Sequence, residues 1–312
     1  HASYRRQRQM CIRDSFMWGP PLLTILLGGG IYFSFYSRFV PFKYFRHGIK
    51  ILFGSYHDPN DPGEITHFQA LTSALASTVG LGNISGVAIA IQMGGPGALF
   101  WMWVSAVVGM STKFFSCTLA VLYRGTDDQG NIQGGPMYYI ENGLGSKYKP
   151  LSIMFSMAGL VGCTVMFQSN QLADIIRNQV FIPNGWFDDD MMRGNLFQGL
   201  IMASLTALVI FGGIKRIGQV ASFMVPIMVV LYLFSGLLVI FNHLSEIPSL
   251  FKLIVYDAFT GDAVMGGAVG AVIIAGVRRA LFSNEAGLGT SDMAHGAATV
   301  SYTHLRAHET VV

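Results

Sequence analysis

The chain has 312 residues, of which 52% are hydrophobic and only 12% are charged, and its mean hydropathy is +0.47. A soluble domain carries about twice that charged fraction, so the composition excludes a disordered chain, a basic nucleic-acid-binding protein and most cytosolic enzymes. The net charge of +3 is too small to indicate an anionic partner. We therefore predict an all-α polytopic membrane protein whose surroundings are a lipid bilayer.

The two ends of the chain are polar and do not continue the pattern beside them. Residues 1–15 and 300–312 resemble translated sequencing-adapter DNA, and they supply the whole positive net charge. We expect both to be adapter-like, non-native extensions of a transmembrane domain at residues 16–299. A native basic extension at the N-terminus is the alternative.

Seven stretches are long and apolar enough for a spanning helix, which needs about 20 residues. In chain order they are Phe16–Tyr36, Phe68–Met93, Gly97–Tyr123, Leu151–Ile176, Leu196–Gly212, Ile217–Phe241 and Ala263–Ala297. The long loops 37–67 and 124–150 are too charged to cross a bilayer. We therefore predict about seven transmembrane helices.

Lysine and arginine residues are distributed unevenly over the loops. Ten lie in the loops after the first, third and fifth stretches, counting Lys113 at a helix end, and three lie in the loops on the opposite side. Because cytoplasmic loops carry the excess of these residues, the first set is predicted to face the cytoplasm.

Two of the stretches are interrupted in a way that a simple helix does not tolerate. TVGLGNISG (Thr78–Gly86) interrupts the second stretch and SNEAGLGT (Ser283–Thr290) the seventh. Non-helical backbone at membrane depth occurs where it lines a cavity or is buried in protein, and paired breaks in two repeats indicate a transporter's binding site. Their spacing predicts a five-helix repeat whose second copy is inverted. Close helix packing through small residues is the alternative.

The chemistry of a broken helix points to a class of ligand. One half-helix end presents N–H groups, which suit a carboxylate, and the other presents carbonyls, which suit a sodium ion or an ammonium group. A small zwitterionic amino acid offers both charges, and Asn83, Ser283 and Asn284 would add neutral contacts. Glu285, close to Arg278 and Arg279, has three interpretations: a structural ion pair, a side chain that reaches a water-filled vestibule, or coupling to an ion or proton.

Other polar residues are less specific. Gln168, near the end of the fourth stretch, could face a cavity or bond a neighbouring helix. His67 and His295 have no second or third ligand at zinc spacing, and the three cysteines have no metal-binding spacing. We therefore predict no transition-metal site.

Five segments together resemble the alanine or glycine:cation symporter family (sodium:alanine symporters). They are GNISGVA (Gly82–Ala88), GGPGALFWMWVSAVVG (Gly94–Gly109), GGPMYYIENGLG (Gly134–Gly145), GGIKRIG (Gly212–Gly218) and FSNEAGLGT (Phe282–Thr290). The resemblance implies a leucine-transporter-type inverted repeat, incomplete here: a first helix, a five-helix repeat and the first helix of a second repeat. The family's chains continue for about four more helices.

The resemblance also implies sodium-coupled symport of alanine or glycine, by alternating access, in a bacterial or archaeal plasma membrane. Its coupling ion is sodium, with contacts on Thr78 and Gly80 and further ligands on a later helix. Its substrate contacts fall on Gly80, Gly82, Asn83, Gln168, Phe282, Ser283, Asn284 and Glu285. The sequence does not indicate an oligomeric state. The alternatives are coupling to another cation or to protons, a non-functional fragment of a symporter, a channel, or an intramembrane enzyme built on Ser283 beside Glu285.

Overall fold

The computed structural model describes residues 19–56, 58, 60–162, 166–186, 191–260 and 269–300. It divides into two compact units: His1–Ile51, Asn83–Leu119 and Met228–Gly289 form the first, and Leu52–Gly82, Ala120–Ile227 and Thr290–Val312 form the second. The predicted extension 1–15, and residues 301–312 of the other, lie outside the described residues.

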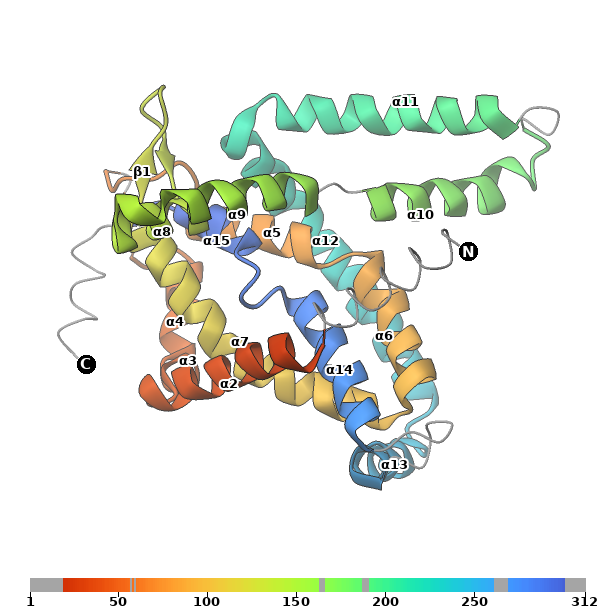
Figure 1. The fold of residues 1–312 in the computed structure, drawn as a ribbon. Helices are drawn as coiled ribbons and strands as arrows, with labels where there is room; N and C mark the ends of the chain where they lie inside the picture. Colours follow the sequence, from red (N-terminus) through yellow and green to blue (C-terminus); the bar gives the residue numbers. More distant parts are fainter. Residues whose placement is uncertain are drawn as a thin grey trace, which may run out of the picture. The chain divides into compact units, whose positions relative to one another are not determined.

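The described residues form helices and one short hairpin (Figure 1). The helices are α2 (Pro20–Tyr36), α3 (Val40–Lys43), α4 (Phe45–Leu52), α5 (His67–Thr78), α6 (Leu81–Gly94), α7 (Gly97–Leu122), α8 (Pro136–Leu144), α9 (Lys149–Gly162), α10 (Met166–Ile176), α11 (Met191–Ile210), α12 (Gly213–Asn242), α13 (Ile247–Thr260), α14 (Val269–Asn284) and α15 (Thr290–Gly296). A 3-10 turn, η1 (Ser146–Tyr148), precedes α9, and a π-helical turn, η2 (Arg177–Phe181), follows α10. Strands β1 (Gly125–Thr126) and β2 (Ile132–Gln133) pair antiparallel between α7 and α8.

The helical prediction is confirmed, and so are both predicted breaks. Among the described residues α7, α11 and α12 are long and apolar enough to cross a membrane, and α5 with α6 makes a fourth, broken candidate. The second predicted stretch divides into α5 and α6, and the seventh into α14 and α15. The chain passes between the two units directly after Gly82 and again directly after Gly289. Two of the five boundaries between the units therefore fall at the two breaks.

Helix α14 forms the centre of the first unit. Helix α6 runs antiparallel to it and α7 runs parallel to it, with small residues at the closest approaches. A Cβ on Gly94 of α6 would lie 2.8 Å from the Cβ of Ala275, and one on Gly276 would lie 2.9 Å from the Cβ of Trp101. The core of this unit therefore lies around α14, whose residues Val272, Val277, Ala280 and Leu281 are buried.

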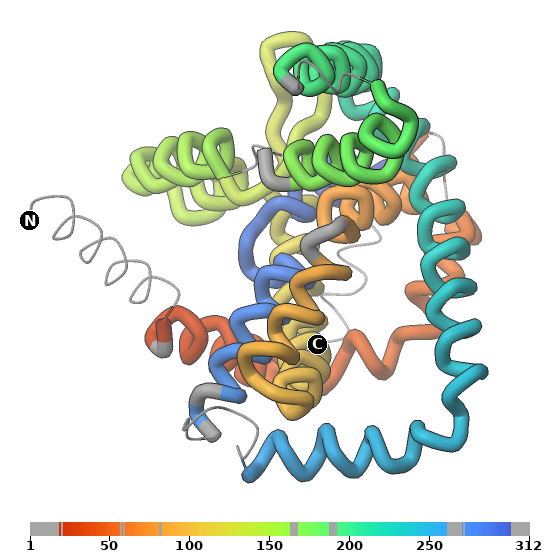
Figure 2. Tube along the Cα trace, turned by 90° about the vertical axis from the view of Figure 1, so that its right-hand side faces the viewer, coloured from red at the N-terminus to blue at the C-terminus, as the bar shows by residue number. Residues whose placement is uncertain are grey.

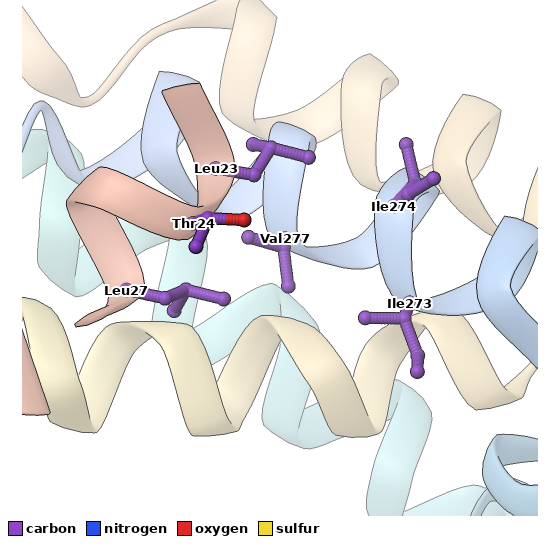
Figure 3. A pocket seen from close by; sticks show the side chains of 6 residues that line it. All are labelled: Leu23, Thr24, Leu27, Ile273, Ile274 and Val277. Atoms are coloured by element: carbon purple, nitrogen blue, oxygen red, sulfur yellow. The ribbon is translucent and has the colours of Figure 1, made fainter. Parts of the chain in front are cut away.

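Helix α2 covers another side of α14. The side chains of α2 and α14 line an apolar pocket of about 160 Å³, formed by Leu23, Thr24, Leu27, Ile273, Ile274 and Val277 (Figure 3). Farther along α2, Ser34 donates a hydrogen bond of 2.8 Å to the hydroxyl of Ser111 on α7. Helix α2 is thus fixed to α14 by apolar contact and to α7 by a buried polar one.

Helix α13 was not predicted. It follows α12 after a short turn (Figure 2) and meets the first turn of α7. The buried carboxylate of Asp257 accepts a 2.7 Å hydrogen bond from the backbone N–H of Gly97, and the indole N–H of Trp101 donates to the carbonyl of Ala258 at 3.0 Å. A residue of α13 therefore caps the N-terminus of α7.

In the second unit, the start of α5 is joined to the end of α15. Ile65 forms a parallel bridge with Ala298 and shares a buried cluster with Ala70 and Ala297. The N–H of Thr299 donates to the carbonyl of Ile65 at 2.7 Å. Thr66 and Gln69 form a capping box on α5, which satisfies two backbone donors at its first turn. The part of the second stretch before its break, α5, is therefore packed against the part of the seventh stretch after its break, α15.

One predicted loop residue lies elsewhere. Lys113 was counted among the charges of the loop after the third stretch, but it is inside α7. Without it the loop bias becomes nine against three, which keeps the predicted orientation. The predicted stretch Gly97–Tyr123 already contained Lys113, so the error was to count this lysine as lying at a helix end.

Candidate functional site

The backbone between α14 and α15 is not helical. Glu285, Gly287 and Gly289 have φ angles of 52°, 85° and 81°, in the left-handed region that glycine adopts freely and glutamate does not. The N–H of Leu288 donates to the carbonyl of Glu285 at 3.1 Å, and the N–H of Ala286 donates to Oδ1 of Asn284 at 2.9 Å. The break is therefore an ordered turn, and it holds a non-glycine residue in a strained conformation.

The last carbonyls of α14 accept hydrogen bonds from two neighbouring helices. Nδ2 of Asn83 on α6 donates to the carbonyl of Ser283 at 3.4 Å, and Nζ of Lys113 on α7 donates to the carbonyl of Asn284 at 3.1 Å. These carbonyls lack helical partners, and the C-terminus of a helix attracts positive charge. The structure therefore brings Asn83, Ser283 and Asn284 together and adds Lys113 to them; that they bind a substrate stays a prediction.

Ser283 and Asn284 also line a pocket between α7 and α14. Its volume is about 220 Å³, and its other lining residues are Leu99, Met102, Trp103, Ala106 and Ala280. Among the described residues, Oγ of Ser283 and Nδ2 of Asn284 are buried without a hydrogen-bond partner. A buried polar group without a partner costs about 1–3 kcal/mol. The pocket is thus a largely apolar space in which two polar groups are available to a small ligand.

Arg279 lies one turn before this pocket on α14. Its guanidinium lies 5.3 Å from the centre of the Phe282 ring and against the backbone of α6 at Gly86, where a Cβ would overlap it. Phe282 itself is exposed. No salt bridge between described residues involves Arg278 or Arg279. The guanidinium of Arg279 thus contacts an aromatic ring and a glycine of α6, and the role of Glu285 stays a prediction.

The other predicted site residues belong to the second unit. The hydroxyl of Thr78, at the end of α5, donates to the carbonyl of Ala74 at 3.0 Å. Gly80 lies between α5 and α6, with open space where a Cβ would be, and Gly82 lies in the first turn of α6. Gln168 is exposed on α10. That these four residues take part in binding stays a prediction.

Two residues that shape the site were missed for a common reason. Lys113 and Gly109 are one helical turn apart on α7 and both meet the end of α14: a Cβ on Gly109 would lie 3.0 Å from Nδ2 of Asn284. The i, i+4 spacing of a glycine and a lysine in an apolar helix is a visible pattern. The helix that this glycine and lysine contact is determined by tertiary packing, and the neighbouring sequence does not indicate it.

Comparisons with known proteins identify the family. The chain matches the sodium:alanine symporter family over residues 6–307. It is 40% identical to the sodium/alanine symporter AgcS of Methanococcus maripaludis, over 93% of this chain and 62% of that protein. It is also 36% identical to GlnT of Bacillus subtilis, a candidate sodium/glutamine symporter, over 93% of this chain and 58% of that protein. The chain spans about three fifths of the length of these relatives.

The names of the relatives describe one class of protein. YrbD of Bacillus subtilis, named as a candidate sodium/proton-dependent alanine carrier, is 38% identical over 93% of this chain and 57% of its own length. These proteins are named as symporters and carriers and not as enzymes, in agreement with the prediction made from the sequence, and the prediction of a multi-pass plasma-membrane protein is confirmed. The chain therefore belongs to the sodium:alanine symporter family.

Proposed function

We propose that the protein carrying this segment is a sodium-coupled symporter of a small neutral amino acid, alanine or glycine, that works by alternating access. The observation that carries the proposal is the pair of helix breaks, after Thr78 and after Asn284, with polar groups gathered at the second. Broken helices at membrane depth are how transporters present backbone groups to a substrate and its coupling ion.

The pocket supports a small substrate. Its volume of about 220 Å³ is below the roughly 300–1,000 Å³ of pockets that hold drug-sized ligands. Ser283 and Asn284 supply a hydroxyl and an amide for hydrogen bonds to a carboxylate, and Asn83, Phe282 and Glu285 complete this side of the proposed site. Leu99, Met102 and Trp103 limit the size of the side chain that the site accepts. Gly80, Gly82 and Gln168 are proposed as further substrate contacts on the basis of the family resemblance.

Sodium is proposed to bind at the end of α5. Thr78 donates its hydroxyl hydrogen to the carbonyl of Ala74, and a hydroxyl oxygen is a suitable ligand for a hard cation. The C-terminus of α5 adds a partial negative charge, and Gly80 allows a close approach to the backbone. We propose that further oxygen ligands come from a helix of the second repeat.

The proposed architecture is the leucine-transporter-type inverted repeat. Residues 16–299 form the transmembrane domain: an additional first helix, a repeat of five spans from α5 to α12, and α14 with α15 as the first span of the second repeat. In support, the two units divide the chain at both breaks. Residues 1–15 and 300–312 are proposed to be extensions outside this domain.

Uptake into proteoliposomes tests the function. The complete protein that contains this segment is reconstituted, and uptake of labelled alanine and glycine is measured with an inward sodium gradient, with an inward proton gradient and with neither. Saturable uptake that requires sodium is expected. Uptake driven by protons alone would favour the runner-up, a proton-coupled symporter. Uptake that neither gradient accelerates would overturn the proposal.

A variant pair tests the pocket. Ser283→Ala should raise the KM for alanine about two- to tenfold, because one hydrogen bond to the substrate is worth about 0.5–1.5 kcal/mol. Ser235→Ala, on the exposed side of α12, is the matched control and should leave KM unchanged. Equal KM values in the two variants would contradict the place of Ser283 in the site.

A further inference from the structure

A lysine lies within a helix that is long and apolar enough to span the membrane. Lys113 is nine residues before Leu122, the last residue of α7, which places it about 14 Å from that end of the helix. It is half-buried. An ionisable side chain at such depth is energetically expensive and indicates a function.

Among the residues that the structure describes, the ammonium group of Lys113 contacts the end of α14. It donates to the backbone carbonyl of Asn284 at 3.1 Å, at the end of α14. Gly109, on the same face of α7 one turn earlier, lets the helices approach: a Cβ there would lie 3.0 Å from Nδ2 of Asn284 and 3.1 Å from the Cβ of Ala286. Helix α7 thus faces the break with a glycine, which permits close packing, and one turn later with a positively charged side chain.

This contact occupies a place that would otherwise suit a free cation. Carbonyls at the end of a half-helix are ligands that broken-helix transporters offer to sodium, and the end of α14 carries a partial negative charge. The carbonyl of Ser283 already accepts from Asn83, and that of Asn284 accepts from Lys113. A sodium ion bonded to the carbonyl of Asn284 would lie within a few ångströms of the ammonium group, and the two charges would repel each other.

We propose that Lys113 is a tethered cation that takes the place of a free monovalent cation at the carbonyl end of α14. While Lys113 is present, this end of the broken helix binds no sodium; when its charge is removed, the same carbonyls bind a monovalent cation. Lys113 therefore limits the number of coupling ions. Only this last consequence rests on the proposed symport, because the exchange of one cation for another is a property of the chain itself.

Thermal unfolding of the 312-residue chain in nanodiscs tests the exchange. Tryptophan fluorescence gives the midpoint in sodium chloride and in N-methylglucamine chloride of equal ionic strength. Lys113→Met removes the charge and keeps the length of the side chain, Lys113→Arg keeps the charge, and Lys252→Met removes a charge from the exposed face of α13. In the salt without sodium, Lys113→Met should unfold at the lowest temperature of the set.

Sodium should then raise the midpoint of Lys113→Met saturably, by about 1–2 °C more than that of the unsubstituted chain, when sodium is at five times its dissociation constant. Lys113→Arg and Lys252→Met should respond as the unsubstituted chain does. An equal sodium response in Lys113→Met and the unsubstituted chain overturns the proposal. A sodium response only in Lys113→Met supports it while counting against a sodium site at α5, so the two proposals fail separately.

A second variant covers the case in which Lys113→Met does not fold. In Lys113→Ala the missing ammonium group can be supplied from solution, so ethylammonium or sodium should restore the folded chain. Tetramethylammonium has the same charge but no N–H to donate, and it should not restore folding. Equal recovery with all three cations, or with none, overturns the proposal.

Discussion

At the scale of single residues, the contact between Gly86 and Arg279 joins α6 to α14. A Cβ on Gly86 would overlap the guanidinium of Arg279, which is the end of a flexible side chain and can move aside, so we expect Gly86→Ala to lower the free energy of unfolding by about 1 kcal/mol. Thermal unfolding in nanodiscs measures the loss. Gly28→Ala is the control, because no atom of a neighbouring helix lies within 4 Å of a Cβ at that position of α2.

A double substitution isolates the cause. If overlap with the guanidinium produces the loss, Gly86→Ala should be nearly neutral in a chain that also carries Arg279→Ala. An equal loss in both backgrounds would mean that the backbone of α6, rather than Arg279, requires glycine here. Because two N–H groups of Arg279 are buried without a partner among the described residues, Arg279→Ala alone removes a destabilising term along with its contact with Phe282.

At the scale of elements, Asp257 shows how a short helix supports a long one. Its buried carboxylate accepts the N–H of Gly97, the first residue of α7. We expect Asp257→Ala to lower the free energy of unfolding by about 1–2 kcal/mol, the usual loss when a cap is removed. Asp257→Asn keeps an acceptor oxygen and should lose less.

The control for this prediction is another carboxylate near α13. Glu246 pairs with His243, and both side chains are exposed, so Glu246→Ala should change the free energy of unfolding by less than about 0.5 kcal/mol. Chemical denaturation of the four proteins gives the comparison. If Asp257→Ala were as stable as Glu246→Ala, the contact between α13 and α7 would have no capping role.

Some of the elements could be predicted from the sequence, and others could not. The breaks after Thr78 and Asn284 were visible because glycine and asparagine interrupt apolar runs, which is a local pattern. Helix α13 was missed because its 14 residues are too few for a span, and Lys252 gave the stretch the character of a loop. The contacts of Lys113 and Asp257 join residues 171 and 160 positions apart, and no local pattern encodes such a distance.

At the scale of the whole molecule, the loop charges predict the topology. With Lys113 inside α7, nine loop lysines and arginines remain on one side and three on the other, which still predicts that the loops before α5 and after α7 face the cytoplasm. Three predicted spans separate Ser146, just before α9, from Ser245, just after α12: α9 with α10, α11 and α12. An odd number of spans places these two serines on opposite sides of the membrane.

Labelling with a membrane-impermeant maleimide measures both orientation and span number. In a chain whose cysteines at 11, 117 and 163 are replaced by alanine, Ser245→Cys should react in intact bacterial cells. Ser146→Cys and Ser55→Cys should react only after permeabilisation, because two predicted spans separate Ser55 from Ser146. Labelling of Ser146→Cys and Ser245→Cys from the same side would contradict three spans between them, and with them the five-span repeat. The reverse pattern would keep the span number but invert the orientation, which would mean that the loop charges do not set the topology of this protein.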